Sequence, residues 1–212
     1  MSRVWLLVLC AALDACLIQN APPDPAPATA AHERHHTSYP GGEKPRWEAM
    51  LLVWSDGRTE RDGFEREYYP SGQMSAERFF AHDRPSGEWS TWFENGALRS
   101  QVGMEAGETL PNRFWHSNGQ LAAEGQAIGG VRLGRWKYWS EAGGLIREGD
   151  YAQGLRDGLW TFYAANGSRQ AEGRYSAGKR TGTWSIWDEE GVEHARAAAE
   201  ISEDGGERSA DP

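Results

Sequence analysis

Few residues of this chain have the types and spacing of a catalytic or metal-binding site. Ser176 and Lys179 match the Ser-x-x-Lys spacing of an acyl-transfer nucleophile and its base, but they lie in a glycine-containing turn without companion motifs. His32, His35 and His36 could offer imidazole nitrogens to a metal ion, but their polar, Pro- and Ala-rich surroundings are typical of solvated histidines. We therefore predict no catalytic residue, no metal site and no cofactor. The chain is predicted not to be an enzyme.

A covalent modification is predicted at one of the two cysteines, both of which lie near the start of the chain. A positively charged start precedes an apolar run to Leu13, and this run is shorter than the roughly 20 helical residues that span a bilayer. The Leu-Asp-Ala-Cys segment that ends at Cys16 resembles the lipobox of bacterial lipoproteins, whose cysteine receives diacylglycerol. We predict residues 1–16 as an export signal with lipidation at Cys16, and plain secretion is the alternative.

An aromatic residue four places before a glycine recurs along the chain and indicates an internal repeat. The successive glycines are separated by 24, 23, 24, 24 and 24 residues. A unit of this length cannot bury an apolar face alone, so neighbouring units must stack into an array. The pairs are Tyr68 with Gly72, Trp92 with Gly96, Trp115 with Gly119, Trp139 with Gly143, Tyr163 with Gly167, and Trp187 with Gly191.

Each unit has the sequence pattern of a β-hairpin. Two runs rich in aromatic and β-branched residues are separated by turn residues, as in the unit from Gly134 to Asp157. Asn-Gly pairs such as Asn95-Gly96 predict type I′ turns at the hairpin tips, and Gly154 to Gly158 predicts a four-residue connecting loop. The predicted fold class is all-β: an elongated antiparallel meander of about six hairpin units, roughly twelve strands, capped at both ends.

Alternation along the strands predicts two different sheet faces. Trp136 and Tyr138 point to a first face, which we expect to be buried. A two-residue tip places Trp136 opposite Gly149, and a four-residue connecting loop places Tyr151 opposite Trp160. The second face carries one aromatic residue per unit among polar neighbours. These residues are the candidate binding surface, although they could also only shield the backbone: Tyr68, Trp92, Trp115, Trp139, Tyr163 and Trp187.

The segments outside the repeats have their own predicted roles. Residues 17–46 are rich in Pro and Ala and are predicted to be a disordered tether. Residues 47–195 form the repeat domain, which begins with a capping strand from Trp47 to Trp54. Residues 196–212 are predicted as a short helix and disordered tail, the helix drawing on the Ala-rich run that starts near Val192. A bulge or bend is predicted near Pro111.

The repeat also resembles a known family. The string Tyr-x-x-Gly-x-Arg-x-Gly-x-Trp, at residues 151–160 and 175–184, resembles the MORN repeat. The tip that follows it, Trp or Tyr followed by x-x-Asn-Gly, is similar to the MORN variant units of bacterial YwqK-type antitoxins. The resemblance covers about residues 47–196. It implies a protein that acts by binding, without a catalytic residue.

The net charge of the chain and its predicted export signal limit the possible functions. A formal net charge of −9 without a basic cluster argues against a nucleic-acid partner. We expect a non-catalytic scaffold of the bacterial cell envelope, lipid-anchored on the periplasmic or outer-membrane side, that binds a protein or, as a second class, a glycan. The alternative is an antitoxin or immunity-like protein that neutralises a partner toxin by direct binding.

Overall fold

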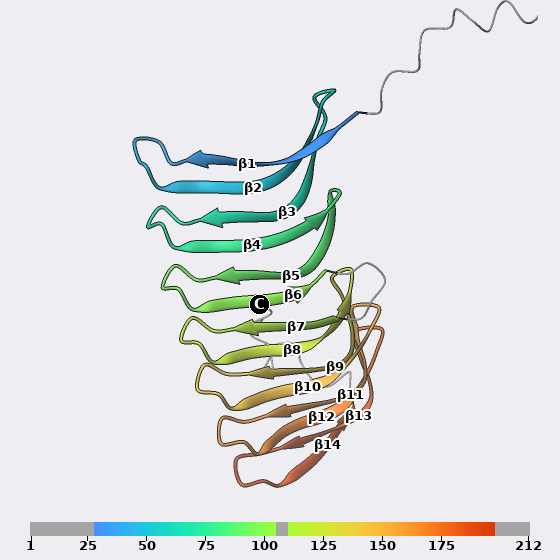
Figure 1. The fold of residues 1–212 in the computed structure, drawn as a ribbon. Coiled ribbons are helices and arrows are strands. Elements are labelled where there is room, and N and C mark those ends of the chain that lie inside the picture. The colour runs from blue at the N-terminus through green and yellow to red at the C-terminus, as the bar shows by residue number, and fades with distance from the viewer. Residues whose placement is uncertain (1–27, 105–109, 198–212) are drawn as a thin grey trace, which may run out of the picture.

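The chain folds as one antiparallel β-sheet whose strands follow each other in sequence order (Figure 1). The computed structural model describes residues 28–104 and 110–197. This fourteen-stranded meander of hairpins confirms the predicted all-β class. Within the described ranges no helix is long and apolar enough to cross a membrane. The strands are β1 (Ala30–Ser38), β2 (Pro45–Trp54), β3 (Thr59–Tyr68), β4 (Met74–Ala81), β5 (Arg84–Trp92), β6 (Leu98–Gly103), β7 (Leu110–Trp115), β8 (Leu121–Ile128), β9 (Val131–Trp139), β10 (Leu145–Ala152), β11 (Leu155–Tyr163), β12 (Arg169–Ser176), β13 (Lys179–Trp187) and β14 (Glu193–Ala197).

The first strand corrects the predicted tether. Residues 30–38 form β1, which pairs antiparallel with β2 from Ala30 opposite Trp54 to Thr37 opposite Trp47. Composition alone missed this strand because its backbone is satisfied by β2, while its side chains are exposed at the edge of the sheet and so need no apolar pattern. The prediction of disorder through residue 46 is therefore wrong from residue 30 onward. Residues 17–27 and the lipidation site Cys16 lie outside the described residues.

The other edge strand corrects the predicted helix. Residues Glu193–Ala197 form β14 and pair with β13, with Ser185 opposite Ala195. The alanines of this run favour a helix, but pairing with the open edge of β13 satisfies its backbone more completely than a single isolated helical turn would. The part of the predicted helix and tail beyond residue 197 lies outside the described residues.

The hairpin tips contain three-residue loops instead of the predicted type I′ turns. At the tip between β5 and β6, Gly96 N–H donates to the Phe93 carbonyl at 2.9 Å, and Phe93 N–H donates to the Ala97 carbonyl at 2.9 Å. Gly96 has φ 85°, whereas Asn95 is not among the residues with positive φ. This is a type I turn followed by a left-handed glycine. The asparagine instead accepts the Ala97 N–H on its Oδ1 at 3.0 Å.

Type I′ turns lie at the opposite ends of the strands. Between β10 and β11, Gln153 and Gly154 have φ 53° and 80°, and Ala152 pairs directly with Leu155. The predicted four-residue loop is therefore wrong, because the extra residues form a bulge further along β11. As a result Trp160 pairs with Gly149 and not with Tyr151, although the Tyr151 and Trp160 rings still meet edge-on with centroids 5.2 Å apart.

The core of the first face is built from indole rings that lie on glycines. Trp136 pairs with Gly149, and Trp160 pairs with Gly173, as predicted from the repeat. The ring of each tryptophan covers the glycine of the preceding strand, so a Cβ at Gly149 would lie only 2.3 Å from Cδ2 of Trp160. The same contact recurs at Gly125, beneath Trp136. No other residue type fits beneath these rings.

The tryptophan side chains of the first face are almost completely buried. Trp136, Trp160 and Trp184 have exposed fractions of 1%, 0% and 1%. The indole N–H of Trp160 donates to the Asp150 carbonyl at 3.0 Å, so the ring is fixed by a hydrogen bond as well as by packing. Tyr151 and Tyr175 fill the space between successive indoles. The hydrophobic core therefore extends across β8 to β13.

The unit of β3 and β4 replaces this aromatic packing with charge. Glu65 of β3 occupies the position of Trp160, and Arg78 of β4 occupies the position of Gly173. The Arg78 guanidinium lies 3.2 Å from the Glu65 carboxylate and 2.6 Å from that of Glu67. An ion cluster thus fills the space that an indole fills in the later units.

The predicted bulge at Pro111 is absent. β7 pairs with β8 without a register shift from Leu110 to Phe114, and Pro111 lies opposite Gln126. The ladder between β6 and β7 ends at Asn112, so β6 offers Pro111 no pairing partner. The amide hydrogen that proline lacks is therefore not needed at this position.

Candidate functional site

The six aromatic residues predicted as a binding surface lie in one row on the second face. Each is the last residue of an odd-numbered strand from β3 to β13, so the row follows the hairpin tips along the sheet. All six are half-buried, which leaves part of each ring open to solvent. The residues are Tyr68, Trp92, Trp115, Trp139, Tyr163 and Trp187.

A polar row that the sequence analysis missed lies beside these aromatic residues. It contains one residue from each strand, linked by direct cross-strand pairing from β1 to β14, and only its last member, an alanine in β14, is apolar. Its members are His36, Glu48, Arg66, Glu77, Ser90, Gln101, Arg113, Glu124, Lys137, Glu148, Thr161, Glu172, Ser185 and Ala195. In the sequence, this row is visible only as a glutamate or glutamine that recurs once per unit. The strand register is needed to show that these residues lie beside the aromatic row.

At the N-terminal end of the polar row, Glu48 is buried among donors. Its carboxylate accepts the Tyr68 hydroxyl at 2.5 Å and Arg34 Nε at 3.1 Å, and its side chain is 7% exposed. Burial raises the pKa of Glu48, but the hydrogen bonds from Tyr68 and Arg34 outweigh this and hold the pKa below its ordinary value. Burial and the Glu48 carboxylate raise the pKa of Tyr68 to about 12. This end of the row is internally satisfied.

The same arrangement recurs near the C-terminal end. The Tyr163 hydroxyl donates to Glu148 Oε1 at 2.8 Å, and Arg135 lies 3.1 Å from the same carboxylate. Burial raises the pKa of Glu148, and the donors Tyr163 and Arg135 lower it further than burial raises it. On the next strand Thr161 donates to Glu172 at 3.1 Å. These polar groups also have partners within the sheet.

The middle of the polar row differs from both ends. The aromatic residue beside Glu124 is Trp139, which has no hydroxyl to donate to a carboxylate. Within the part of the chain that the structure describes, Arg113, Glu124 and Lys137 form no ion pair and no side-chain hydrogen bond. Arg113 and Lys137 are exposed. The central polar groups are therefore available to a ligand.

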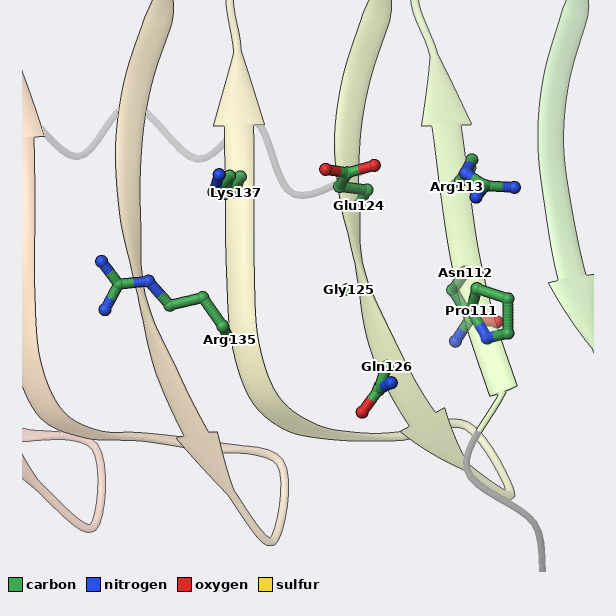
Figure 2. Close-up of a pocket in the computed structure, with 8 residues that line it drawn as sticks. All are labelled: Pro111, Asn112, Arg113, Glu124, Gly125, Gln126, Arg135 and Lys137. Atoms are coloured by element: carbon green, nitrogen blue, oxygen red, sulfur yellow. The ribbon is translucent and has the colours of Figure 1, made fainter.

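A shallow hollow of about 390 Å³ lies over this central part (Figure 2). Figure 2 shows Arg113, Glu124 and Lys137 side by side on β7, β8 and β9, with Arg135 extending toward β10. Arg135 is held there by Glu148. The hollow is lined by Pro111, Asn112, Arg113, Glu124, Gly125, Gln126, Arg135 and Lys137.

A second hollow, of about 720 Å³, lies near the tips of the first two hairpins. Its tyrosines are already engaged, since Tyr39 OH donates to the Tyr68 carbonyl at 2.7 Å and Tyr69 OH donates to the Trp92 carbonyl at 2.9 Å. These bonds connect successive tips. The hollow is lined by Thr37, Tyr39, Arg46, Trp47, Glu67, Tyr68, Tyr69 and Ser75.

The residues considered for chemistry in the sequence do not form a site in the structure. Ser176 and Lys179 flank a two-residue turn and pair with each other as strand neighbours. His32 contacts Asp62 at 2.6 Å on one face of β1, whereas alternation places His35 on the other. Across residues 28–104 and 110–197, no group of three or more His, Cys, Asp or Glu side chains could hold a metal ion.

Comparison with known proteins identifies the repeat unit. The family model described as MORN repeat variant matches residues 61–82 and 156–177. The first match runs from β3 to the turn after β4, and the second runs from β11 to the turn after β12, so each covers one hairpin. A search of curated proteins found no match. Two hairpins of this sheet thus match the MORN repeat variant family, and the chain is a repeat scaffold that contains such units.

Proposed function

We propose that this protein is a non-catalytic scaffold that binds a protein partner through the second face of its sheet. The observation that carries the proposal is the difference between the two faces. On the first face, the indoles of β9, β11 and β13 are buried on glycines and serve the core. On the second face, six half-buried aromatic residues lie beside a polar row whose central members form no ion pair and no side-chain hydrogen bond within the described residues.

The composition of the second face fits a protein interface. Interfaces are enriched in Trp, Tyr and Arg, which combine a large apolar area with a polar or charged group. Arg113 and Lys137 line the central hollow, and Trp115 and Trp139 follow them two residues further along the same strands. An array also extends such a surface over many strands, which favours an elongated partner segment.

A site-specific photo-crosslinker tests this proposal in the native cell. Benzoylphenylalanine replaces Gln126, an exposed residue that lines the central hollow of the second face, or, as the control, Gln153 in the exposed turn between β10 and β11. We expect a discrete protein adduct from position 126 only, and we expect Trp139→Ala to remove it. Equal adducts from both positions, or an adduct from position 153 alone, would contradict binding through the second face.

We further propose that the scaffold is attached to the cell envelope through a diacylated Cys16. The support is the short apolar leader and the lipobox-like segment that ends at this cysteine. The mass of the mature N-terminus, measured from a membrane fraction, tests this against Cys16→Ser. A diacylated cysteine in the native chain alone is expected. An intact Met1 in the soluble fraction would overturn envelope attachment and favour the toxin-neutralising alternative.

A further inference from the structure

We infer that the central part of the second face binds an acidic peptide segment of the partner, with its carboxylates on Arg113 and Lys137. This inference rests on the proposed function and adds the chemistry of the ligand. It starts from a contrast within the polar row. Cations and carboxylates form ion pairs within the sheet toward both ends of the row, whereas Arg113, Glu124 and Lys137 in the middle form no ion pair within 4.0 Å among the described residues.

Part of the pairing contrast follows from the aromatic residue of each unit. Where the aromatic residue of a unit is tyrosine, its hydroxyl donates to the glutamate of the preceding strand, as Tyr68 does to Glu48 and Tyr163 does to Glu148. Trp139 occupies the same position relative to Glu124 but has no hydroxyl. Glu124 therefore lacks the internal donor that the corresponding carboxylates have.

The cations beside Glu124 also form no ion pair within 4.0 Å in the described residues, and the charge of Lys137 acts on the neighbouring Glu148 only from a longer distance. Arg66, near the N-terminal end of the row, is 2.7 Å from Glu77, and Arg135 is 3.1 Å from Glu148. Arg113 and Lys137 have no such carboxylate within 4.0 Å, and both are exposed. An exposed guanidinium and ammonium on either side of a hollow are donors for carboxylates, and the guanidinium can bind one bidentately.

The spacing fits an extended peptide that crosses the strands. Arg113, Glu124 and Lys137 are direct cross-strand neighbours on β7, β8 and β9, as Figure 2 shows. Neighbouring strands are about 4.8 Å apart, so the two cations lie about 10 Å apart at their backbones, while alternate side chains of an extended peptide are about 7 Å apart. The flexible Arg113 and Lys137 side chains can close this difference.

Glu124 sets a further requirement on the ligand. Its carboxylate lies between the two cations and repels a carboxylate placed directly above β8. Acidic side chains that alternate with small neutral ones can reach both cations and avoid Glu124. The hollow thus favours alternating acidic sequences over a single isolated carboxylate, and Glu124→Gln is expected to strengthen binding.

Binding of defined peptides to the full-length chain tests the inference. The probe is a terminally blocked Glu-Ser-Glu-Ser-Glu-Ser peptide, and the matched neutral probe has Gln in place of Glu. Tryptophan fluorescence at low ionic strength reports binding, because Trp115 and Trp139 lie two residues from Arg113 and Lys137 on the same strands and the same face. We expect the acidic peptide alone to bind, and we expect binding to weaken as salt screens the charges.

Charge-matched variants locate the site. Arg113→Gln combined with Lys137→Gln is expected to weaken acidic-peptide binding about five- to tenfold, as the loss of two exposed ion pairs implies. The control, Arg174→Gln combined with Lys179→Gln, removes the same charge from exposed residues elsewhere and is expected to change the affinity less than twofold. Both variants should keep the wild-type circular dichroism spectrum and thermal midpoint, because all four side chains are exposed.

The outcomes separate this inference from the proposed function. Equal weakening in both double variants, or equal binding of the neutral peptide, would overturn the acidic-peptide site. Stronger binding to phosphatidylglycerol vesicles or to inorganic phosphate than to the peptide, lost in the Arg113 and Lys137 variant, would overturn the choice of a peptide ligand. If no peptide binds but the cross-link at position 126 persists, the proposed function stands and this inference falls.

Discussion

Replacing a single glycine beneath an indole should destabilise the array far more than replacing an open glycine. In Gly149→Ala, the new Cβ would lie 2.3, 2.4 and 2.5 Å from Cδ2, Cε2 and Cγ of Trp160, a fully buried ring. Real Cβ atoms essentially never come this close, so the indole must move out of its position. We expect a loss of about 3 kcal/mol in the free energy of unfolding, the upper part of the range for overpacked cores.

The matched control is Gly144→Ala in the tip between β9 and β10. Gly144 is not among the glycines with positive φ, and a Cβ there would meet only Ser140 Oγ at 3.6 Å, an ordinary contact. This substitution should leave the protein unchanged or stabilise it by up to about 1 kcal/mol, because alanine restricts the unfolded chain. Both variants replace glycine by alanine, so they differ only in whether the new Cβ meets an indole ring.

Urea unfolding followed by far-ultraviolet circular dichroism measures both effects. A double-mutant cycle of Gly149→Ala with Trp160→Ala identifies the cause, because removal of the ring also removes the clash. The double variant should be more stable than the sum of the two single losses predicts, by about 1 kcal/mol or more. Equal stability of the two glycine variants, or strict additivity in the cycle, would refute the packing of indoles on glycines.

Three further predictions concern the polar row and the hairpin tips. Tyr163→Phe removes the hydroxyl that donates to Glu148 and should lower the free energy of unfolding by about 1–2 kcal/mol, measured by urea unfolding. In a Glu148→Ala background, which lacks the acceptor, the same substitution should cause no such loss. The pKa of Glu148 is lowered in the folded state, so its stabilising contribution is complete above the ordinary value near 4.5 and lost as the pH falls through the folded pKa. The difference in thermal midpoint between wild type and Glu148→Gln should therefore shrink between pH 6 and pH 3, and a constant difference would contradict this linkage. The Asn118 side chain accepts the Gln120 N–H and donates to the Glu141 carbonyl of the next tip. Asn118→Ala should therefore lower the free energy of unfolding by about 1 kcal/mol and speed amide hydrogen exchange at the tip. Unchanged exchange would show that this link between tips does not contribute.

The repeat period and the division into two faces could be predicted from sequence because each unit confirms its neighbours. Alternation placed Trp136 and Tyr138 in the core, and both are 1% exposed. The same pattern placed Trp139 on the other face, where it is half-buried. The pattern of a single strand is compatible with several structures, but the same pattern repeated in every unit indicates one.

The turn types could not be read from the Asn-Gly pairs alone. Asn95-Gly96 suits a type I′ turn, but the same pair also suits a type I turn in which only the glycine has positive φ. The turns with positive φ at both central residues lie at pairs with two, one or no glycine: Gly129-Gly130, Gln153-Gly154 and His82-Asp83. Choosing between the two requires the strand register, which is a property of the whole sheet.

The edge strand and the polar row were missed for a related reason. β1 has no apolar period, and only its pairing with β2 identifies it as a strand. The contrast between Glu148, which has a tyrosine donor, and Glu124, which has none, depends on contacts between neighbouring strands. Local sequence patterns contain neither piece of information.

Fluorine NMR of the 5-fluorotryptophan protein tests most directly whether the second face is the binding surface. The alternating acidic peptide is titrated into the full chain, and each resonance is assigned by single substitution. We predict that Trp115 and Trp139 shift while Trp136 and Trp160, buried on the first face, do not. Shifts of Trp136 and Trp160 without shifts of Trp115 and Trp139 would place binding on the first face and contradict the account.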